Sequence, residues 1–296
     1  MARILLFGAN GQLGRELRRS LLASGNLTAL SRNECDIIDK DKITTIIRDL
    51  QPEIIVNSAA YTNVDKAEKD KKTAMLVNAR APATIAQLAR ENNALLVDYS
   101  TDYVFNGTKP GAYVETDIPD PVNVYGQSKL AGLQAIQQSG CRHIVFRVSW
   151  VYGRYGNNFV KTMLRLGKEK AELKIIADQR GSPTPANLIA DVTAQAIGQI
   201  QSGRGEEGVY NLVPAGLTSW YGYAEAIFEH AVKVAHYKKP ELLPIKTSEY
   251  ASEYTVAAKR PLNSCLSTEK LERVFNVRMP EWQHPLKQII EEIIAE

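Results

Sequence analysis

The chain has 296 residues, of which 44% are apolar and 23% are charged, as in an ordinary soluble globular protein with one large α/β domain or two modest ones. Its net charge of +3 comes from interspersed acids and bases, which argues against nucleic acid or a membrane surface as a partner. Three cysteines without metal-ligand spacing, and no signal sequence or membrane-spanning apolar stretch, predict reduced thiols and a cytoplasmic protein.

The first half of the chain alternates short apolar strands with helix-period segments. Because the strands are nearly all apolar, they predict a parallel sheet that is covered on both faces, with right-handed crossovers. This is the pattern of an α/β, Rossmann-type doubly wound fold. The predicted strands cover residues 3–7, 27–30, 54–57, 94–100 and 143–148, and the predicted helices cover 12–23, 41–50, 73–92 and 125–138.

After Trp150 the pattern loosens. We expect residues 1–150 to form a dinucleotide-binding domain and residues 151–296 a smaller substrate lobe, partly interleaved with late elements of the sheet. The loop 105–123 is too long for a mere connection and is expected to border a site, and 242–261 reads as loop-rich. The second half predicts helices over 158–166, 188–200, 219–234, 268–275 and 281–294, with strands over 173–176 and 208–212.

A glycine-rich turn follows the first predicted strand. Gly8 permits a tight exit from the strand, Gly11 lets the backbone approach phosphate oxygens, and Gly14 allows the helix to pack closely on the sheet. The first helical residues, Gln12 and Leu13, would present their amides to an anion at the helix N-terminus. The spacing predicts a seat for a dinucleotide pyrophosphate; the alternative is a glycine-rich strand-to-helix junction with no ligand.

The end of the second strand is expected to meet the adenosine ribose. An acid there would bond the 2′-hydroxyl, whereas Ser31 and Arg32 suit a 2′-phosphate, which favours NADPH with NADH as the alternative cofactor. Arg32 can also be read as a solvated surface charge. Asp36 and Ile37 follow in a turn-like segment and are expected to flank the adenine.

Small residues follow the third strand, where a cofactor would lie across the strand ends. Ala59, Ala60, Tyr61 and Thr62 are therefore candidate cofactor contacts, and simple packing is the competing explanation.

Tyr125 and Lys129 are four residues apart and share one face of a predicted helix. A free phenol ionises near pH ~10 and is a poor base at neutrality, so a nearby ammonium that favours the phenolate would bring it closer to the working pH. Downstream of a nucleotide-binding turn, this pair predicts acid–base chemistry beside a nicotinamide. In isolation the same spacing often means a surface pair.

The segment directly after the fourth strand carries Thr101, Asp102 and Tyr103. Carboxyl ends of strands are where open parallel sheets bind ligands, and a hydroxyl there can hydrogen-bond a carbonyl oxygen that is being reduced. The alternative is a capped strand exit without a ligand.

Together these motifs resemble the extended short-chain dehydrogenase/reductases and, within them, the dTDP-4-dehydrorhamnose reductase family. The resemblance covers essentially the whole chain. It rests on the glycine turn and on residues 57–68, 99–107, 125–129, 147–153, 178–184, 210–212 and 259–264.

The resemblance implies reduction of the C4 ketone of a dTDP-linked 6-deoxyhexose, with Tyr125 as proton donor. It further implies that Lys129 orients the nicotinamide ribose and the phenol, and that Thr101 bonds the sugar oxygen. The implied substrate contacts are Asp102 and Tyr103 in the sugar pocket, Trp150 on the nucleotide-sugar and Arg180 on its diphosphate. Trp150 can equally be a core residue, and Arg260 is a weaker candidate because Lys259-Arg260 can be a solvated pair.

Three other functions compete with reduction. A 4,6-dehydratase typically needs Asp-Glu after the catalytic threonine, and Tyr103 stands where the second carboxylate would be. A nucleotide-sugar 4-epimerase uses the same tyrosine and fits the same residues. A non-catalytic cofactor-binding subunit is disfavoured because Thr101, Tyr125 and Lys129 are all present.

Some members of the resembling family dimerise through carboxylates around magnesium. Glu16 could contribute to such a site, but Asn187 stands where those members carry an acid. We therefore predict no metal site, while a homodimer stays compatible with the sequence.

Overall fold

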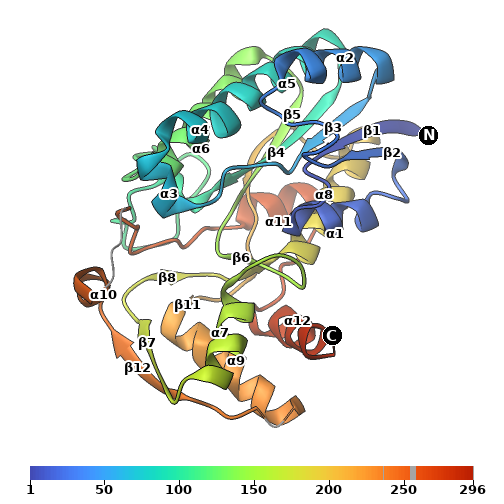
Figure 1. Ribbon diagram of the computed structural model, residues 1–296. Helices are drawn as coiled ribbons and strands as arrows, with labels where there is room; N and C mark the ends of the chain where they lie inside the picture. Colours follow the sequence, from blue (N-terminus) through green and yellow to red (C-terminus); the bar gives the residue numbers. More distant parts are fainter. Residues whose placement is uncertain (236, 254–257, 296) are drawn as a thin grey trace.

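Six parallel strands form the central sheet in the computed structural model, which describes residues 1–235, 237–253 and 258–295 (Figure 1). Their spatial order is β10-β5-β4-β3-β1-β2, with parallel pairing throughout. The predicted parallel, doubly wound sheet is therefore confirmed. The strands are β1 (Ala2–Phe7), β2 (Gly25–Leu30), β3 (Ile54–Asn57), β4 (Leu95–Thr101), β5 (His143–Val148) and β10 (Gly208–Asn211).

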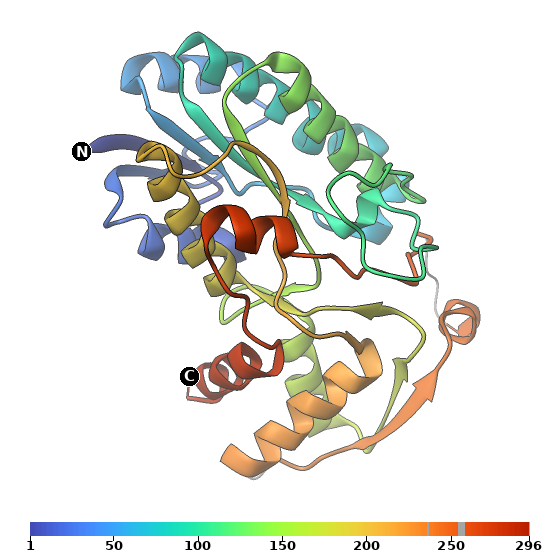
Figure 2. The same ribbon diagram turned by 180° about the vertical axis from the view of Figure 1, so that it is seen from behind.

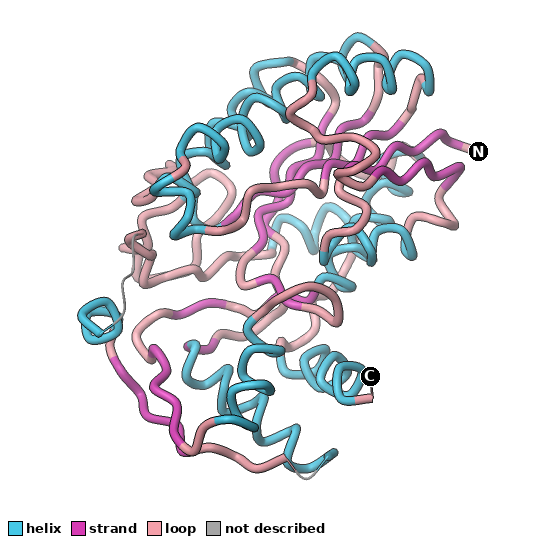
Figure 3. The backbone as a smooth tube through the Cα atoms, in the orientation of Figure 1, coloured by secondary structure: helices cyan, strands magenta, loops and turns pink. Residues whose placement is uncertain are grey.

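Helices cover both faces of this sheet, because successive side chains of each strand point to opposite sides. In β1, Ile4 and Leu6 pack in one apolar core, whereas Leu5 and Phe7 pack in a second core on the other side of the sheet. Figures 2 and 3 show the sheet between its two helical layers. One layer contains α1 (Gln12–Ser20), α8 (Ala186–Gln201) and α11 (Glu269–Phe275), and the other α2 (Lys40–Leu50), α5 (Ala81–Glu91) and α6 (Val124–Ser139).

The helix predicted over 73–92 is longer and less regular than expected. It follows α3 (Val64–Lys69), begins as α4 (Lys71–Met75), widens into a π-helical turn, η1 (Leu76–Arg80), and continues as α5. Asp70 ends α3 and caps α4 by accepting the Thr73 amide. Single π turns are frequent at functional sites, and this one carries Asn78, which reaches Ser128 on α6.

A further apolar core, separate from the two cores at the sheet, contains Tyr152, Tyr223, Phe228 and Trp282, and the elements around it form the second lobe. Its main strands, β7 (Glu172–Ile176) and β12 (Glu241–Ile245), pair in parallel. The helices of the second lobe are α7 (Phe159–Glu169), α9 (Trp220–Ala235), α10 (Thr247–Glu253) and α12 (Gln283–Ile294). The short elements along the chain are η2 (Asp102–Val104), β6 (Val151–Tyr152), β8 (Arg180–Gly181), β9 (Thr184–Pro185) and β11 (Thr218–Ser219).

The stretch 242–261, predicted to be loop-rich, instead contains most of β12 and all of α10, so that expectation was wrong there. The apolar residues Leu242, Leu243 and Ile245 gain strand structure by pairing with β7, which is a tertiary effect that local propensity does not report. Residues 254–257 of this stretch lie outside the described residues. Among the described residues, the structure contains no helix of the length and apolarity that crossing a membrane requires.

Candidate active site

The strand-to-helix turn after β1 requires glycine at two positions, Gly8 and Gly14. Gly8 has φ +79°, a left-handed conformation. A Cβ on Gly14 would overlap the Gly8 carbonyl, so the helix can approach the strand only without a side chain there. Gly11 occupies the N-cap of α1 without a side-chain capping bond. The first amides of α1 are therefore available to an anion, and this glycine-lined cradle fits the pyrophosphate of a dinucleotide.

Gln12 connects this turn to the second lobe. Its side chain donates to the Val151 carbonyl (3.3 Å) and accepts from Asn158 Nδ2 (2.9 Å). Asn158 also caps α7 by accepting the Lys161 amide at 3.1 Å. The sequence suggested only a backbone role for Gln12, and it gave no indication of Asn158, because the two are 146 residues apart.

The end of β2 carries charges of both signs. Arg32 donates from Nε to Asp36 at 2.9 Å, and its side chain is 78% exposed. The Ser31 amide and hydroxyl both bond one Glu34 carboxylate oxygen, at 2.8 and 2.7 Å, and these bonds lower the pKa of Glu34. Ile37 is buried in the core beside α2. The end of β2 therefore carries both the Arg32 guanidinium, which the sequence indicated, and the Glu34 carboxylate, which it did not.

The segment after β3 lies against the glycine turn: a Cβ on Gly8 would come within 2.7 Å of the Ala59 amide nitrogen. Ala60 and Thr62 are exposed. Asn78 fixes Tyr61 by bonding both its amide and its carbonyl, each at 2.9 Å. The Tyr61 hydroxyl is buried and has no hydrogen-bond partner among the described residues.

Thr101 ends β4, and Tyr125 lies near it on α6. Burial raises the pKa of Tyr125 to about 12, the nearby Thr101 hydroxyl lowers it and the Asp102 carboxylate raises it. We expected the Lys129 ammonium to lower this pKa. Instead, Lys129 Nζ lies 3.8 Å from an oxygen of Asp98, a buried acid that the sequence analysis did not single out. Tyr125 therefore keeps its proton at neutral pH, which suits a proton donor better than a base.

Asp102 is a buried acid directly beside this centre. It accepts from the Thr101 hydroxyl at 2.9 Å, while its second carboxylate oxygen is buried without a partner among the described residues. Burial raises the pKa of Asp102 to about 6, against the lowering effect of the Ser264 and Thr101 hydroxyls. The Tyr103 ring meets the Tyr125 ring edge-on at 5.7 Å.

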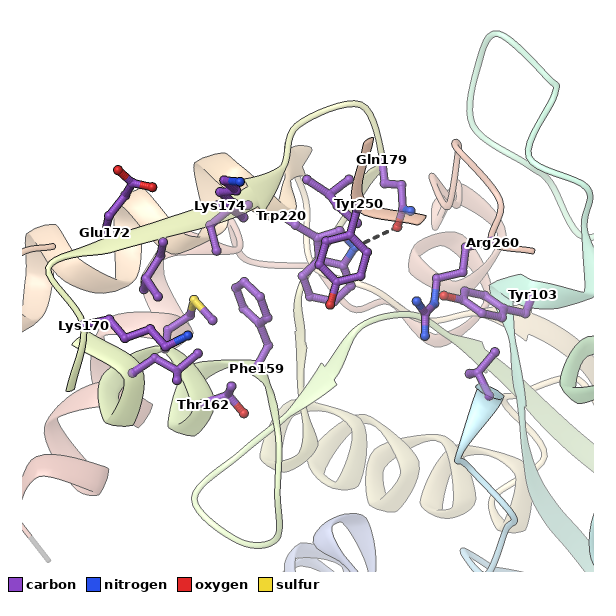
Figure 4. Close-up of a pocket in the computed structure, with 16 residues that line it drawn as sticks. Tyr103, Phe159, Thr162, Lys170, Glu172, Lys174, Gln179, Trp220, Tyr250 and Arg260 are labelled. Carbon is purple, nitrogen blue, oxygen red and sulfur yellow. Dashed lines mark hydrogen bonds between the residues drawn. The ribbon is translucent and has the colours of Figure 1, made fainter. Parts of the chain in front are cut away.

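A cavity of about 760 Å³ leads away from this centre into the second lobe. That volume is typical of a small-molecule site. Figure 4 shows Tyr103 and Arg260 at one end and Lys170, Glu172 and Lys174 at the other. Between them lie Phe159, Thr162, Gln179, Trp220 and Tyr250. Met163 and Leu166 also line the cavity.

The cavity includes Tyr103 and Arg260 but not the other four predicted substrate contacts, of which Thr101 and Asp102 lie at the end of β4. The described side chains that line it do not include Trp150 or Arg180. Trp150 has a left-handed backbone (φ +47°) and stacks on Trp220 at 3.8 Å, so it supports the cavity from behind. Arg180 pairs through its backbone with Leu262, and its side chain is exposed. Trp220 was not predicted from the sequence, in which its only signal is an aromatic residue at the start of a predicted helix.

The carboxylate considered for magnesium, Glu16, has a different partner. Arg19 bonds Glu16 at 3.4 Å and Asp191 at 2.6 Å. Among the described residues, no three potential ligands gather in a metal-like cluster.

Comparison with known proteins identifies the family. The model of the RmlD substrate binding domain family matches residues 2–295. The dTDP-4-dehydrorhamnose reductase of Escherichia coli K12 is 45% identical over 99% of this chain and 98% of its own length. The chain belongs to the dTDP-4-dehydrorhamnose reductase family.

Solved structures of other members of the dTDP-4-dehydrorhamnose reductase family share the whole fold. The Bacillus anthracis reductase, crystallised in complex with NADP, is 36% identical, with a TM-score of 0.90 over 98% of this chain and 99% of that chain. The Clostridium acetobutylicum member is 32% identical, with a TM-score of 0.91 over 99% of this chain and all of that chain.

Proposed function

We propose that this chain reduces the C4 ketone of dTDP-4-dehydro-6-deoxy-L-mannose (dTDP-4-dehydrorhamnose) to dTDP-L-rhamnose. One observation carries the proposal: Thr101 and a protonated, half-buried Tyr125 lie together at the end of β4, beside the cavity that Tyr103 lines. The 45% identity to the Escherichia coli enzyme supports the same substrate.

NAD(P)H fits the cradle that Gly8, Gly11 and Gly14 form, and its reduced nicotinamide supplies the hydride for the ketone carbon. We propose NADPH as the preferred form because Arg32 is exposed at the end of β2, and NADH as a second, weaker reductant because Glu34 is also there. The segment from Ala59 to Thr62 would complete the cofactor site at the end of β3.

Tyr125 has the role of proton donor in this proposal. With a pKa of about 12 it is protonated across the neutral range, and it gives its proton to the ketone oxygen as that oxygen becomes an alkoxide. The Thr101 hydroxyl, which now donates to Asp102, turns to the same oxygen when the sugar binds. The unpaired oxygen of Asp102 then accepts from a sugar hydroxyl.

The test is a coupled assay in which dTDP-glucose is converted by a 4,6-dehydratase and a 3,5-epimerase before this protein and NADPH or NADH are added. Stoichiometric loss of absorbance at the reduced-nicotinamide band, with formation of dTDP-L-rhamnose, is the expected result. No oxidation of either cofactor would overturn the proposal. Tightly bound cofactor with no net oxidation and a changed sugar configuration would instead identify a 4-epimerase.

A further inference from the structure

A buried carboxylate lies behind Lys129. Asp98 Oδ1 is 3.8 Å from Lys129 Nζ, and only 5% and 6% of these two side chains are exposed. The other oxygen, Asp98 Oδ2, accepts a hydrogen bond of 2.6 Å from Asn57 Nδ2. Asn57 in turn accepts from the Ala59 amide at 3.3 Å. One contact chain therefore runs from the segment after β3 to the ammonium of α6.

The register of the sheet explains this arrangement. Asn57 and Asp98 are direct neighbours on β3 and β4. Their strand positions face the α6 side of the sheet, because Leu96, two residues earlier on β4, packs in the same core as Leu133 of α6. A polar pair at the end of an otherwise apolar face costs desolvation unless it is matched by opposite charge, and Lys129 supplies that charge.

The electrostatics show how strongly the two groups depend on each other. Burial lowers the pKa of Lys129, and Asp98 is the one charged side chain among the described residues that raises it again. Burial raises the pKa of Asp98, against the lowering effects of Lys129 first and Asn57 second. The nearby phenol Tyr125 is neutral at pH 7 and supplies no counter-charge.

Two other titratable groups lie at this end of the sheet, on η2, which packs against α6. Tyr103 is also neutral at pH 7, since burial raises its pKa. Asp102 is directed to Thr101. Neither takes the place of Asp98 as the partner of Lys129.

We propose that Asp98 is a positioning residue for the reaction: clamped by Asn57, its carboxylate keeps the Lys129 ammonium charged and fixed in place beside Tyr125. The proposal rests on the proposed function for its catalytic consequence. Asp98 touches neither substrate nor cofactor in this account and acts only through Lys129.

The test compares wild type with Asp98→Asn, which keeps the shape and the Asn57 contact but removes the charge. Without its counter-charge, Lys129 loses its proton at a lower pH. We expect kcat at neutral pH to fall about 10-fold or more, the alkaline limb of kcat to move down by about one pH unit or more, and KM for the nucleotide-sugar to change less than about threefold. Unchanged kcat and an unchanged alkaline limb in a folded Asp98→Asn variant would overturn the proposal.

Two further variants separate positioning from general damage. Ser100→Ala, two residues along β4 on the same buried face, removes a hydroxyl without a partner among the described residues and is expected to leave kcat unchanged. In a Lys129→Met background, Asp98→Asn should add little further loss, since contacting residues are non-additive when one acts through the other. Full additivity of the two losses would refute an action through Lys129.

Cofactor affinity provides a readout that does not depend on the sugar. In titrations with NADPH alone at high pH, Asp98→Asn should bind several-fold more weakly than wild type, while both should bind alike at low pH. If wild type binds NADPH but reduces no sugar, the proposed function fails and this comparison still decides the role of Asp98. If Asp98→Asn does not fold, the wild-type profile decides, because an alkaline limb near neutrality would show that Asp98 does not keep Lys129 charged.

Discussion

The glycine turn at the end of β1 and the cavity beside Tyr103 are built in opposite ways. The turn comes from seven consecutive residues, Gly8 to Gly14, and its shape is fixed by where side chains are missing. The cavity is lined by side chains of α7, β7, α9 and α10, together with Arg260, and it exists only when distant segments come together. A cofactor site of this kind can therefore be predicted from a short stretch of sequence, whereas a substrate site that is lined by distant segments cannot.

The largest effect is expected where these two regions meet. Tyr125→Phe removes the proton donor and should lower kcat by about 10²–10⁴-fold, while NADPH affinity and KM for the sugar stay within about threefold. Steady-state kinetics and cofactor titration measure the three quantities. Tyr210→Phe is the matched control, because its hydroxyl bonds the Glu206 carbonyl away from the site. A variant that keeps most of its turnover would remove Tyr125 from the chemistry.

The turn itself is tested by Gly14→Ala. Its methyl group would overlap the Gly8 carbonyl, so strand and helix must separate, and NADPH affinity should fall by about 10²-fold. Gly198→Ala on α8 is the control, because a Cβ there meets nothing within 4 Å and, at this exposed position, should stabilise the helix by about 0.5–1 kcal/mol. Fluorescence titration gives the affinity, and circular dichroism checks the fold. Undiminished binding by Gly14→Ala would contradict the close-packing argument.

The cavity is tested by Trp220→Ala. This change removes a wall of the cavity and the stack on Trp150, and we expect KM for the nucleotide-sugar to rise about 10-fold with NADPH affinity unchanged. Val232→Ala, on the exposed side of the same helix, should change neither. If Trp220→Ala weakened NADPH and spared the sugar, the assignment of the two regions would have to be exchanged.

A smaller effect concerns Asp102, at the junction. Its folded-state pKa of about 6 lies above its usual range, so the folded protein holds this proton more tightly than the unfolded chain and loses stability as the pH rises through 6. Asp102→Asn carries no charge at this position. Above pH ~7 its free energy of unfolding should exceed that of wild type by at most about 3 kcal/mol. The difference should vanish below pH ~3, where the Asp102 carboxyl of wild type is protonated in both the folded and the unfolded state.

Denaturant unfolding at several pH values measures this difference, and Asp120→Asn, which changes an exposed carboxylate bonded to Asn106, is the control. A stability gain for Asp102→Asn that did not depend on pH would contradict the buried-charge explanation.

Features of the fold that are fixed by short stretches of sequence were predictable, and features that need contacts between distant segments were not. The parallel strands and their helices were predictable, because apolar runs and helical periodicity are local. The π turn at Leu76–Arg80 was not; in the structure it carries Asn78, which bonds Ser128 of α6, and a contact between such distant residues is not visible in the sequence. Nor were β12 and the cavity wall at Trp220, which require pairing and packing across the second lobe.

In the candidate site, the sequence predicted some of the functional residues but not all of them. Thr101, Tyr125 and Lys129 were singled out from their spacing and from the family resemblance. The partner of Lys129 was not, because Asp98 sits in a strand that reads as buried and the sequence does not say which face it points to. Burial and strand register, rather than residue type, give that carboxylate its significance.

The bond between Gln12 and Asn158 ties the first turn of α1 to the first turn of α7. We therefore expect a phosphate that binds at the start of α1 to restrict the start of α7 as well, and with it the part of the cavity wall that Phe159 and Thr162 form. Because such coupling is reciprocal, a sugar nucleotide that binds against α7 should raise the affinity for the dinucleotide by the same factor by which the dinucleotide raises the affinity for the sugar nucleotide. Cutting this bond with Asn158→Ala should make the two ligands bind independently, which calorimetry of each in the presence of the other would measure.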